Sequence, residues 1–114
     1  MSVSVSITFD RFPQIAAKLP VETKAVVVKT AYDVEGRAKG LITSQNAIDT
    51  GRLLNSVEAK PIGEFVWEIA PHTEYAIYVE MGTYKMGARP YMIPAGEAAK
   101  GPFVQAMTQL LQRL

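Results

Sequence analysis

The chain has 114 residues, of which 48% are hydrophobic and 20% charged, and its formal net charge is +1. A chain of this length is expected to fold as one domain around one core. The absence of cysteine excludes a disulfide framework and a cysteine-rich zinc module, and the near-neutral charge argues against phosphate binding over a broad surface.

The first third of the chain predicts a strand followed by two helices. Val3–Phe9 alternates apolar and small polar side chains, which is the two-residue period of a half-buried strand. Arg11–Leu19 is expected to form one or two helical turns that end at a proline. Val21–Thr43 has apolar residues at helical spacing and predicts an amphipathic helix of about six turns. Gly36 and Gly40 within it indicate close approach by another element or frayed last turns.

The middle of the chain predicts a short helical turn and then a hairpin. Asp49 is suited to cap a turn over Thr50–Leu54. Ser56–Lys60 and Phe65–Ala70 read as two strands joined by a turn that contains proline and glycine. Tyr75–Met81 fits a strand and a helix equally well. The side chains of the second strand expected to face the core are Phe65, Trp67 and Ile69.

The C-terminal part predicts a basic loop, Lys85–Arg89, and a second helical region, Ile93–Leu114, which Gly101-Pro102 is expected to kink or split. The order of elements predicts one α+β domain over residues 1–114. In it a small antiparallel sheet, made of the N-terminal strand and the central hairpin, packs on the long amphipathic helix. Such a small sheet has open edges, which must be covered, charged or paired with a neighbouring subunit.

Two catalytic arrangements are possible on paper. Asp49-Thr50-Gly51 matches the half-site of an aspartic protease, whose two Asp side chains share a proton in a homodimer. An arginine follows this tripeptide and would keep both carboxylates ionised, so the helix cap is the favoured interpretation. Ser56 and His72 could join Asp49 in a triad, but no nucleophile motif surrounds the serine. His72 with Glu74 does not define a metal site.

The charged residues are unevenly placed along the chain. An acidic stretch holds Glu58, Glu64, Glu68, Glu74 and Glu80 against Lys60, and a basic stretch holds Lys85, Arg89, Lys100 and Arg113 against Glu97. A solvated surface explains this distribution, and so does head-to-tail association of copies into a ring.

Three short segments occur together and in a fixed order. Residues 49–57 read DTGRLLNSV, residues 75–83 read YAIYVEMGT, and residues 88–95 read ARPYMIPA. This combination resembles the tail-component family of lambdoid long-tailed bacteriophages, whose members carry DTGxLxxS, YAxxVExGT and xRPFxxPA. The chain departs from the family pattern at Ile77, where proline is common, and at Met81 and Tyr91, where phenylalanine is common.

The resemblance implies a structural virion protein without enzymatic activity or cofactor: a tail completion or head-tail joining protein of the neck that forms a homo-oligomeric, hexameric ring. Expected neighbours are the connector or stopper, the tail terminator and the tail tube, and non-specific passage of DNA through the ring is left open. The expected location is the virion neck, and the host cytoplasm during assembly. Alternatives are a tail terminator or another neck ring protein, a small toxin-type or regulatory binding module and, more distantly, the retropepsin-like protease using Asp49. No run of about 18 apolar residues predicts a membrane span, and no secretory signal is expected.

The same motifs are rich in residues that favour protein interfaces. Arg52 and Arg89 can grip carboxylates such as Glu80 or Asp49 with two hydrogen bonds, and tyrosines cluster nearby. The loop Gly82–Arg89 is therefore expected to dock on a neighbouring copy or another neck protein. The residues expected at the subunit interface are Asp49, Thr50, Gly51, Arg52, Tyr75, Tyr78, Glu80, Gly82, Thr83, Lys85, Arg89 and Pro90.

Overall fold

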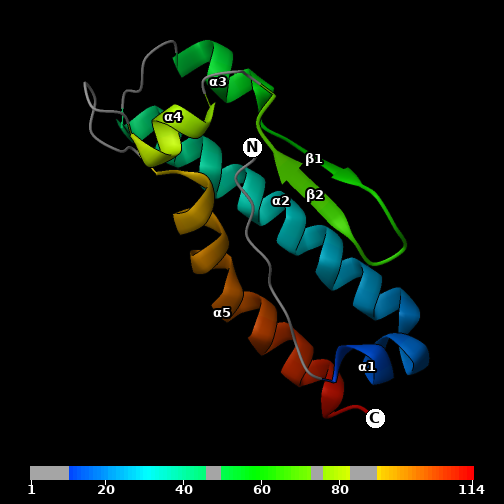
Figure 1. Cartoon of the computed structure of the whole chain (residues 1–114). Helices are drawn as coiled ribbons and strands as arrows, with labels where there is room; N and C mark the ends of the chain where they lie inside the picture. Colours follow the sequence, from blue (N-terminus) through cyan, green and yellow to red (C-terminus); the bar gives the residue numbers. More distant parts are fainter. Residues whose placement is uncertain (1–10, 46–49, 73–75, 83–89) are drawn as a thin grey trace.

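The computed structural model describes residues 11–45, 50–72, 76–82 and 90–114 (Figure 1). The molecule is elongated, with principal extents of 52 × 22 × 21 Å. The elements of the described residues are α1 (Phe12–Lys18), α2 (Pro20–Gln45), α3 (Thr50–Ser56), β1 (Glu58–Pro61), β2 (Trp67–Ala70), α4 (Ala76–Met81) and α5 (Met92–Leu111). The α+β architecture is confirmed: the structure is mostly helical, and its two-stranded antiparallel sheet packs on a long helix.

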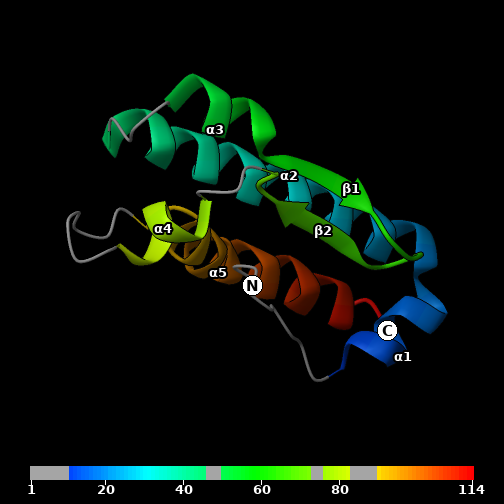
Figure 2. The same cartoon turned by 45° about the horizontal axis from the view of Figure 1, so that its top comes forward.

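The two long helices form the body of the molecule. Helix α5 returns along α2 in the opposite direction (Figures 1 and 2). Small side chains separate them, because Ala38 of α2 and Ala95 and Ala99 of α5 are fully buried. Such residues let two helix backbones approach closely. The amphipathic helix predicted over residues 21–43 is confirmed, and it runs from Pro20 to Gln45.

The prediction made for Gly36 and Gly40 is wrong. A Cβ atom added at Gly36 or Gly40 would meet nothing within 4 Å, so no element approaches α2 there, and the helix continues past both residues. Helix α5 is not split, because it is continuous through Pro102. Gly101 lacks the Cβ atom that would clash with the following proline ring in helical geometry, and both residues are exposed to solvent.

The predicted hairpin is confirmed, with shorter strands than expected. Strands β1 and β2 pair antiparallel from Glu58 opposite Ala70 to Pro61 opposite Trp67, and the hairpin lies over α2 (Figure 1). The Trp67 ring packs against Tyr32 of α2 with 5.4 Å between centroids. Ser56 belongs to α3 rather than to the first strand.

The core has two clusters of buried residues along the molecule. The first joins α2, α3, α4 and α5, and the second joins α1 to the C-terminal half of α5. The first cluster contains Val34, Ala38, Ile42, Leu53, Val57, Ala76, Val79, Tyr91, Met92, Ala95 and Ala99. The second contains Ile15, Phe103, Met107 and Leu110.

Several predictions concern residues outside the described part of the chain. These are the strand Val3–Phe9, the cap Asp49, and Glu74, Tyr75, Thr83 and the loop Lys85–Arg89. The ambiguous segment before Gly82 is helical over Ala76–Met81. None of the described helices is both long enough and apolar enough to cross a membrane.

Candidate functional site

The most strongly organised polar site joins α4 to the start of α5. Glu80, on α4, is only 2% exposed. Its Oε1 accepts hydrogen bonds from the backbone amides of Tyr91 at 3.1 Å and Met92 at 2.8 Å, and its Oε2 accepts one from Ile93 at 3.3 Å. A carboxylate on the short helix α4 therefore caps the N-terminus of the long helix α5.

The chemistry of a helix N-terminus explains this arrangement. The first amides of a helix have no partner within the helix, and together they carry a partial positive charge. Tyr91, at the N-cap position of α5, supplies no side-chain hydrogen bond to them. Glu80 supplies both the missing acceptors and a negative charge. We call this contact the α4–α5 joint, and define it by Glu80, Tyr91, Met92 and Ile93.

Tyr91 fastens the joint at a second point. Its side chain is fully buried in the first core cluster, and its hydroxyl donates a hydrogen bond to the carbonyl of Ala76 at 3.2 Å. Ala76 begins α4, whereas Glu80 lies near the end of that helix. The start of α5 is consequently bound to both ends of α4, which fixes the two helices relative to each other.

The joint also fixes the base of the loop between the two helices. Gly82 ends α4 with φ 81°, a left-handed conformation that glycine adopts without steric cost. The chain returns at Pro90, next to Tyr91, whose amide is held by Glu80. The loop residues expected at an interface, including Lys85 and Arg89, therefore connect two anchored ends, although residues 83–89 themselves lie outside the described part of the chain.

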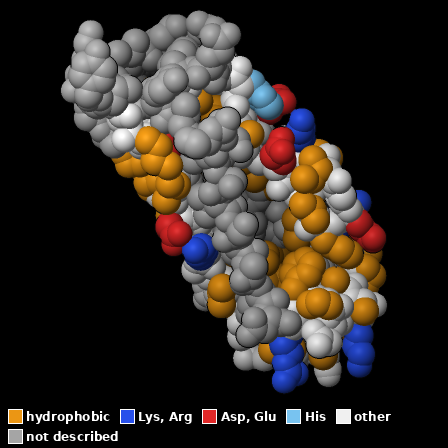
Figure 3. Space-filling view, in the orientation of Figure 1, with side chains coloured by type: hydrophobic (Ala, Val, Ile, Leu, Met, Phe, Trp, Pro, Cys, Tyr) orange, Lys and Arg blue, Asp and Glu red, His pale blue; other side chains and the backbone are white. Residues whose placement is uncertain are grey.

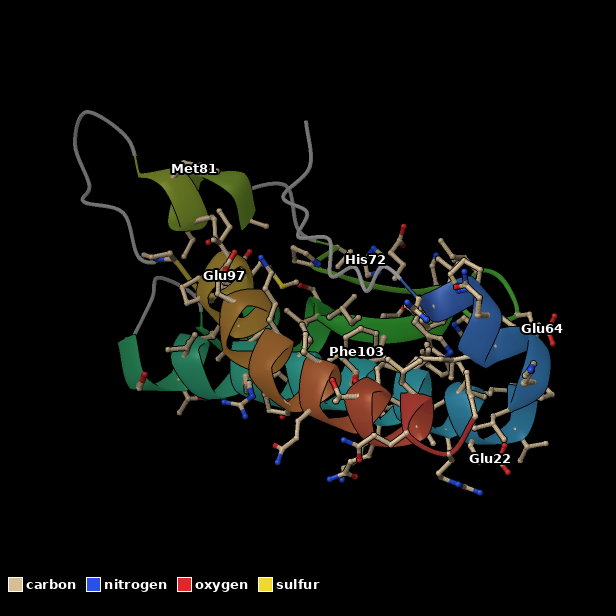
Figure 4. All side chains as sticks on the ribbon, turned by 90° about the horizontal axis from the view of Figure 1, so that it is seen from below. Glu22, Glu64, His72, Met81, Glu97 and Phe103 are labelled. Atoms are coloured by element: carbon tan, nitrogen blue, oxygen red, sulfur yellow. The ribbon has the colours of Figure 1, made fainter. Side chains whose placement is uncertain are left out.

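Two large apolar side chains are exposed beside these anchored ends. Met81 is 56% exposed at the end of α4, and Ile93 is 36% exposed in the first turn of α5. Figure 4 shows Met81 where α4 meets the loop, and Figure 3 shows hydrophobic side chains at this end of the molecule. Sequence analysis missed this pair as surface residues. The helical period indicates their exposure. Val79 and Glu80 of α4 and Met92 and Ala95 of α5 face inward, which leaves Met81 and Ile93 on the outward faces.

The structure brings together the second and third motifs of the sequence but gives some of their residues a different role. Glu80 was expected at a subunit interface, where Arg52 or Arg89 could grip it from the same chain or from a neighbour; within this chain its side chain is buried and bonded to the amides of α5. Tyr91 is likewise used inside the chain. One sequence feature indicates this role: no Ser, Thr, Asp or Asn stands at the cap position of the second helical region, so its cap must come from elsewhere.

The first motif lies on a separate element. Thr50, Gly51 and Arg52 form the first turn of α3, whose Leu53 is fully buried in the same core cluster as Val79 and Tyr91. The helix predicted after Asp49 is therefore present.

The described residues do not assemble the catalytic triad considered above. The Ser56 hydroxyl donates to the carbonyl of Leu53 within α3 at 2.8 Å, and no hydrogen bond links it to His72. His72 lies 3.3 Å from Glu58, Nε2 to Oε1, on an exposed part of the hairpin (Figure 4). Within the described residues, no group of three or more His, Cys, Asp and Glu side chains could hold a metal ion.

Ion pairs within the chain reduce the charge separation seen in the sequence. Glu68 lies 3.6 Å from Lys60 across the hairpin, and Lys100 lies 3.0 Å from Glu97 on α5. Glu80 is buried and adds nothing to an acidic surface. The expected acidic and basic regions are thus partly neutralised inside one molecule.

Comparison with known proteins gave no match: no family model fits the chain, and no curated protein or solved structure is significantly similar to it.

Proposed function

We propose that this chain is a structural subunit of the neck of a long-tailed bacteriophage, a tail completion or head-tail joining protein that works as a member of a homo-oligomeric ring. The observation that carries the proposal is the ordered set of three motifs described above. Two of these motifs meet in the folded chain at the α4–α5 joint. No catalytic step is part of the proposed role, which is to bind neighbouring copies and neck proteins in a fixed arrangement.

The structural roles of residues in the second and third motifs support this proposal. Val79 and Ala95 are buried in the core, Glu80 caps α5, and Gly82 supplies the left-handed turn. All of them hold the base of one loop in a fixed position. Buried hydrogen bonds make the base of this loop rigid, and a loop on a rigid base is suited to binding a partner.

The surface around the loop base has the composition of a contact site. Met81 and Ile93 are exposed apolar side chains, and the sequence of the loop that joins their helices contains Lys85 and Arg89. Apolar anchors combined with arginine are typical of the energetically important centres of protein interfaces. We infer that this surface meets a neighbouring copy or an adjacent neck protein, such as the connector, the tail terminator or the tail tube.

A matched pair of variants on α5 tests this assignment. Ile93→Glu places a charge in the proposed contact, whereas Val104→Glu makes the same change at a residue of similar exposure, 41%, in the middle of α5. Purified variants are added to separate heads and tails, and infectious particles are counted. We expect at least a tenfold loss of joined particles for Ile93→Glu, no loss for Val104→Glu, and unchanged melting temperatures for both.

Equal joining activity of the two variants would remove Ile93 from the interface. Failure of the unmodified protein to join heads and tails would overturn the proposed function itself.

A further inference from the structure

The hairpin has two faces with different surroundings. Side chains of a strand point alternately to its two faces. Trp67 and Ile69 of β2 face α2, because Trp67 packs on Tyr32 and Ile69 packs against the first core cluster. The residues that alternate with them face away from α2. We call this side the outer face of the hairpin, and it consists of Glu58, Lys60, Ile62, Val66, Glu68 and Ala70.

The outer edge of β1 offers no amide to a further strand. The amide of Ala59 donates to Glu35 Oε2 of α2 at 3.2 Å. Pro61, the next residue whose main chain points outward, has no amide hydrogen. The amide of Val57, ahead of the strand, donates to the carbonyl of Leu54 at 3.4 Å. Association along this edge is therefore disfavoured, and the outer face is the surface of the hairpin that is suited to meet another molecule.

The tip half of the outer face is apolar. Ile62 and Val66 are 59% and 53% exposed, and they are neighbours across the hairpin, because the amide of Ile62 donates to the carbonyl of Val66 at 2.9 Å. Figure 3 shows hydrophobic side chains gathered in the region where the hairpin tip and α1 lie in Figure 1. Removing two adjacent apolar side chains from water favours contact with another surface.

The base half of the outer face is charged and self-complementary. Lys60 of β1 lies opposite Glu68 of β2 in the ladder, with 3.6 Å between Nζ and Oε1, and both side chains are about half exposed. A face that carries a cation and an anion side by side can match a second copy of itself, provided that the copy is turned so that each cation meets an anion.

A two-fold axis parallel to the strands gives this match. When two hairpins are stacked face to face about such an axis, β1 of each copy lies over β2 of the other. Residues that pair across one hairpin then also face each other between copies, so Lys60 meets Glu68 and Ile62 meets Val66. Stacked sheets lie about 10 Å apart, a gap that a lysine and a glutamate side chain can bridge together. An axis across the strands would instead place Lys60 over Lys60, which is repulsive.

We propose that the outer face of the hairpin is a self-association surface, through which two copies of this chain pair face to face about a two-fold axis parallel to the strands. The face is small, since a stable interface takes roughly 20–30 residues a side. The pair is therefore weak, with a dissociation constant of about 0.1–1 mM. This inference does not depend on the proposed function, because a two-fold contact joins two copies and adds no third.

Sedimentation equilibrium of the full chain tests the proposal. Between about 20 µM and 1 mM we expect the average mass to rise from one chain toward two. Val66→Glu should weaken association at least tenfold, because it places a charge among the apolar side chains of both copies. Val104→Glu makes the same change at an exposed valine of α5 and should leave association unchanged. Fluorescence of Trp67, the only tryptophan, reports whether the hairpin stays folded on α2 in each variant.

An exchange of charges tests the orientation of the two copies. Lys60→Glu and Glu68→Lys should each weaken association about tenfold, because like charges then face each other between copies. An equimolar mixture of these two variants should associate at least as strongly as the unmodified protein, since each glutamate of one variant then faces a lysine of the other.

A mass of one chain at every concentration would overturn the proposal. Association that Val66→Glu leaves unchanged, or a mixture of charge variants that does not recover, would also overturn it. Ile93→Glu should not affect this pairing. Loss of association in that variant would place the contact beside the α4–α5 joint, at the surface proposed for the neck ring, and would count against the hairpin.

Discussion

The clearest test of the α4–α5 joint is the substitution Glu80→Gln. Glutamine has nearly the same shape as glutamate, but it lacks the negative charge and carries one oxygen in place of two. If its oxygen keeps the bonds to Tyr91 and Met92, its NH₂ group faces the amide of Ile93, and two donors then oppose each other in a buried site. The other orientation leaves the two shorter bonds without an acceptor.

The expected loss follows from these contacts. A buried amide without an acceptor costs about 1–3 kcal/mol, and the lost interaction between a negative charge and the helix N-terminus adds about 0.3–1 kcal/mol. We therefore expect Glu80→Gln to lower the free energy of unfolding by about 2 kcal/mol. For a domain of this size the corresponding fall in melting temperature is about 8 °C.

Urea denaturation followed by circular dichroism at constant pH measures this loss. Glu97→Gln is the matched control, because Glu97 is exposed and pairs with Lys100 on the surface of α5. Its effect should stay below about 0.5 kcal/mol. Indistinguishable unfolding midpoints for Glu80→Gln and the unmodified protein would refute the role assigned to the carboxylate.

Three further substitutions follow from the structure. Tyr91→Phe removes the hydrogen bond to the carbonyl at the start of α4 but keeps the buried ring, so we expect a loss of about 1 kcal/mol in the same denaturation assay; no loss would argue against this second fastening point. Gly82→Ala should destabilise by about 1–2 kcal/mol because of its positive φ, whereas Gly40→Ala should stabilise by about 0.5–1 kcal/mol; effects of the same sign would contradict the backbone argument. Glu35→Ala removes the acceptor of the Ala59 amide on β1, so this amide becomes free to pair with another chain and we expect more self-association, detected by light scattering. Asp33→Ala, on the same helix, should leave the oligomeric state unchanged; equal self-association of the two variants would show that Glu35 does not protect the edge of β1.

Much of the fold was predictable from the sequence because periodicity and turn residues are local properties. The apolar spacing over residues 21–43 predicted α2, and alternation around a turn with proline and glycine predicted the hairpin. The glycine predictions failed because a glycine in a helix can face solvent as readily as another element, and sequence does not distinguish the two. Helix α5 runs through Pro102, which cannot donate the backbone hydrogen bond of a helical residue. The missing hydrogen bond lies on the exposed face of the helix, and only the packing of α5 reveals which face that is.

The site was harder to predict, since its central contact is long-range. Glu80 and Met92 are twelve residues apart, and sequence reasoning treated the glutamate as a surface group because ionised side chains are seldom buried. The motifs indicated which residues matter, but not that Glu80 and Tyr91 act inside the chain. The exposed pair Met81 and Ile93 became visible only when the inward faces of α4 and α5 were known.

Electron microscopy of particles assembled without this protein is the most direct test of the proposed role in the neck. The gene is removed from the phage that encodes the chain, and lysates are imaged with and without added protein. We expect full heads and complete tails that remain separate, and joined infectious particles once the protein is restored. Joined particles of normal titre in its absence would contradict the account.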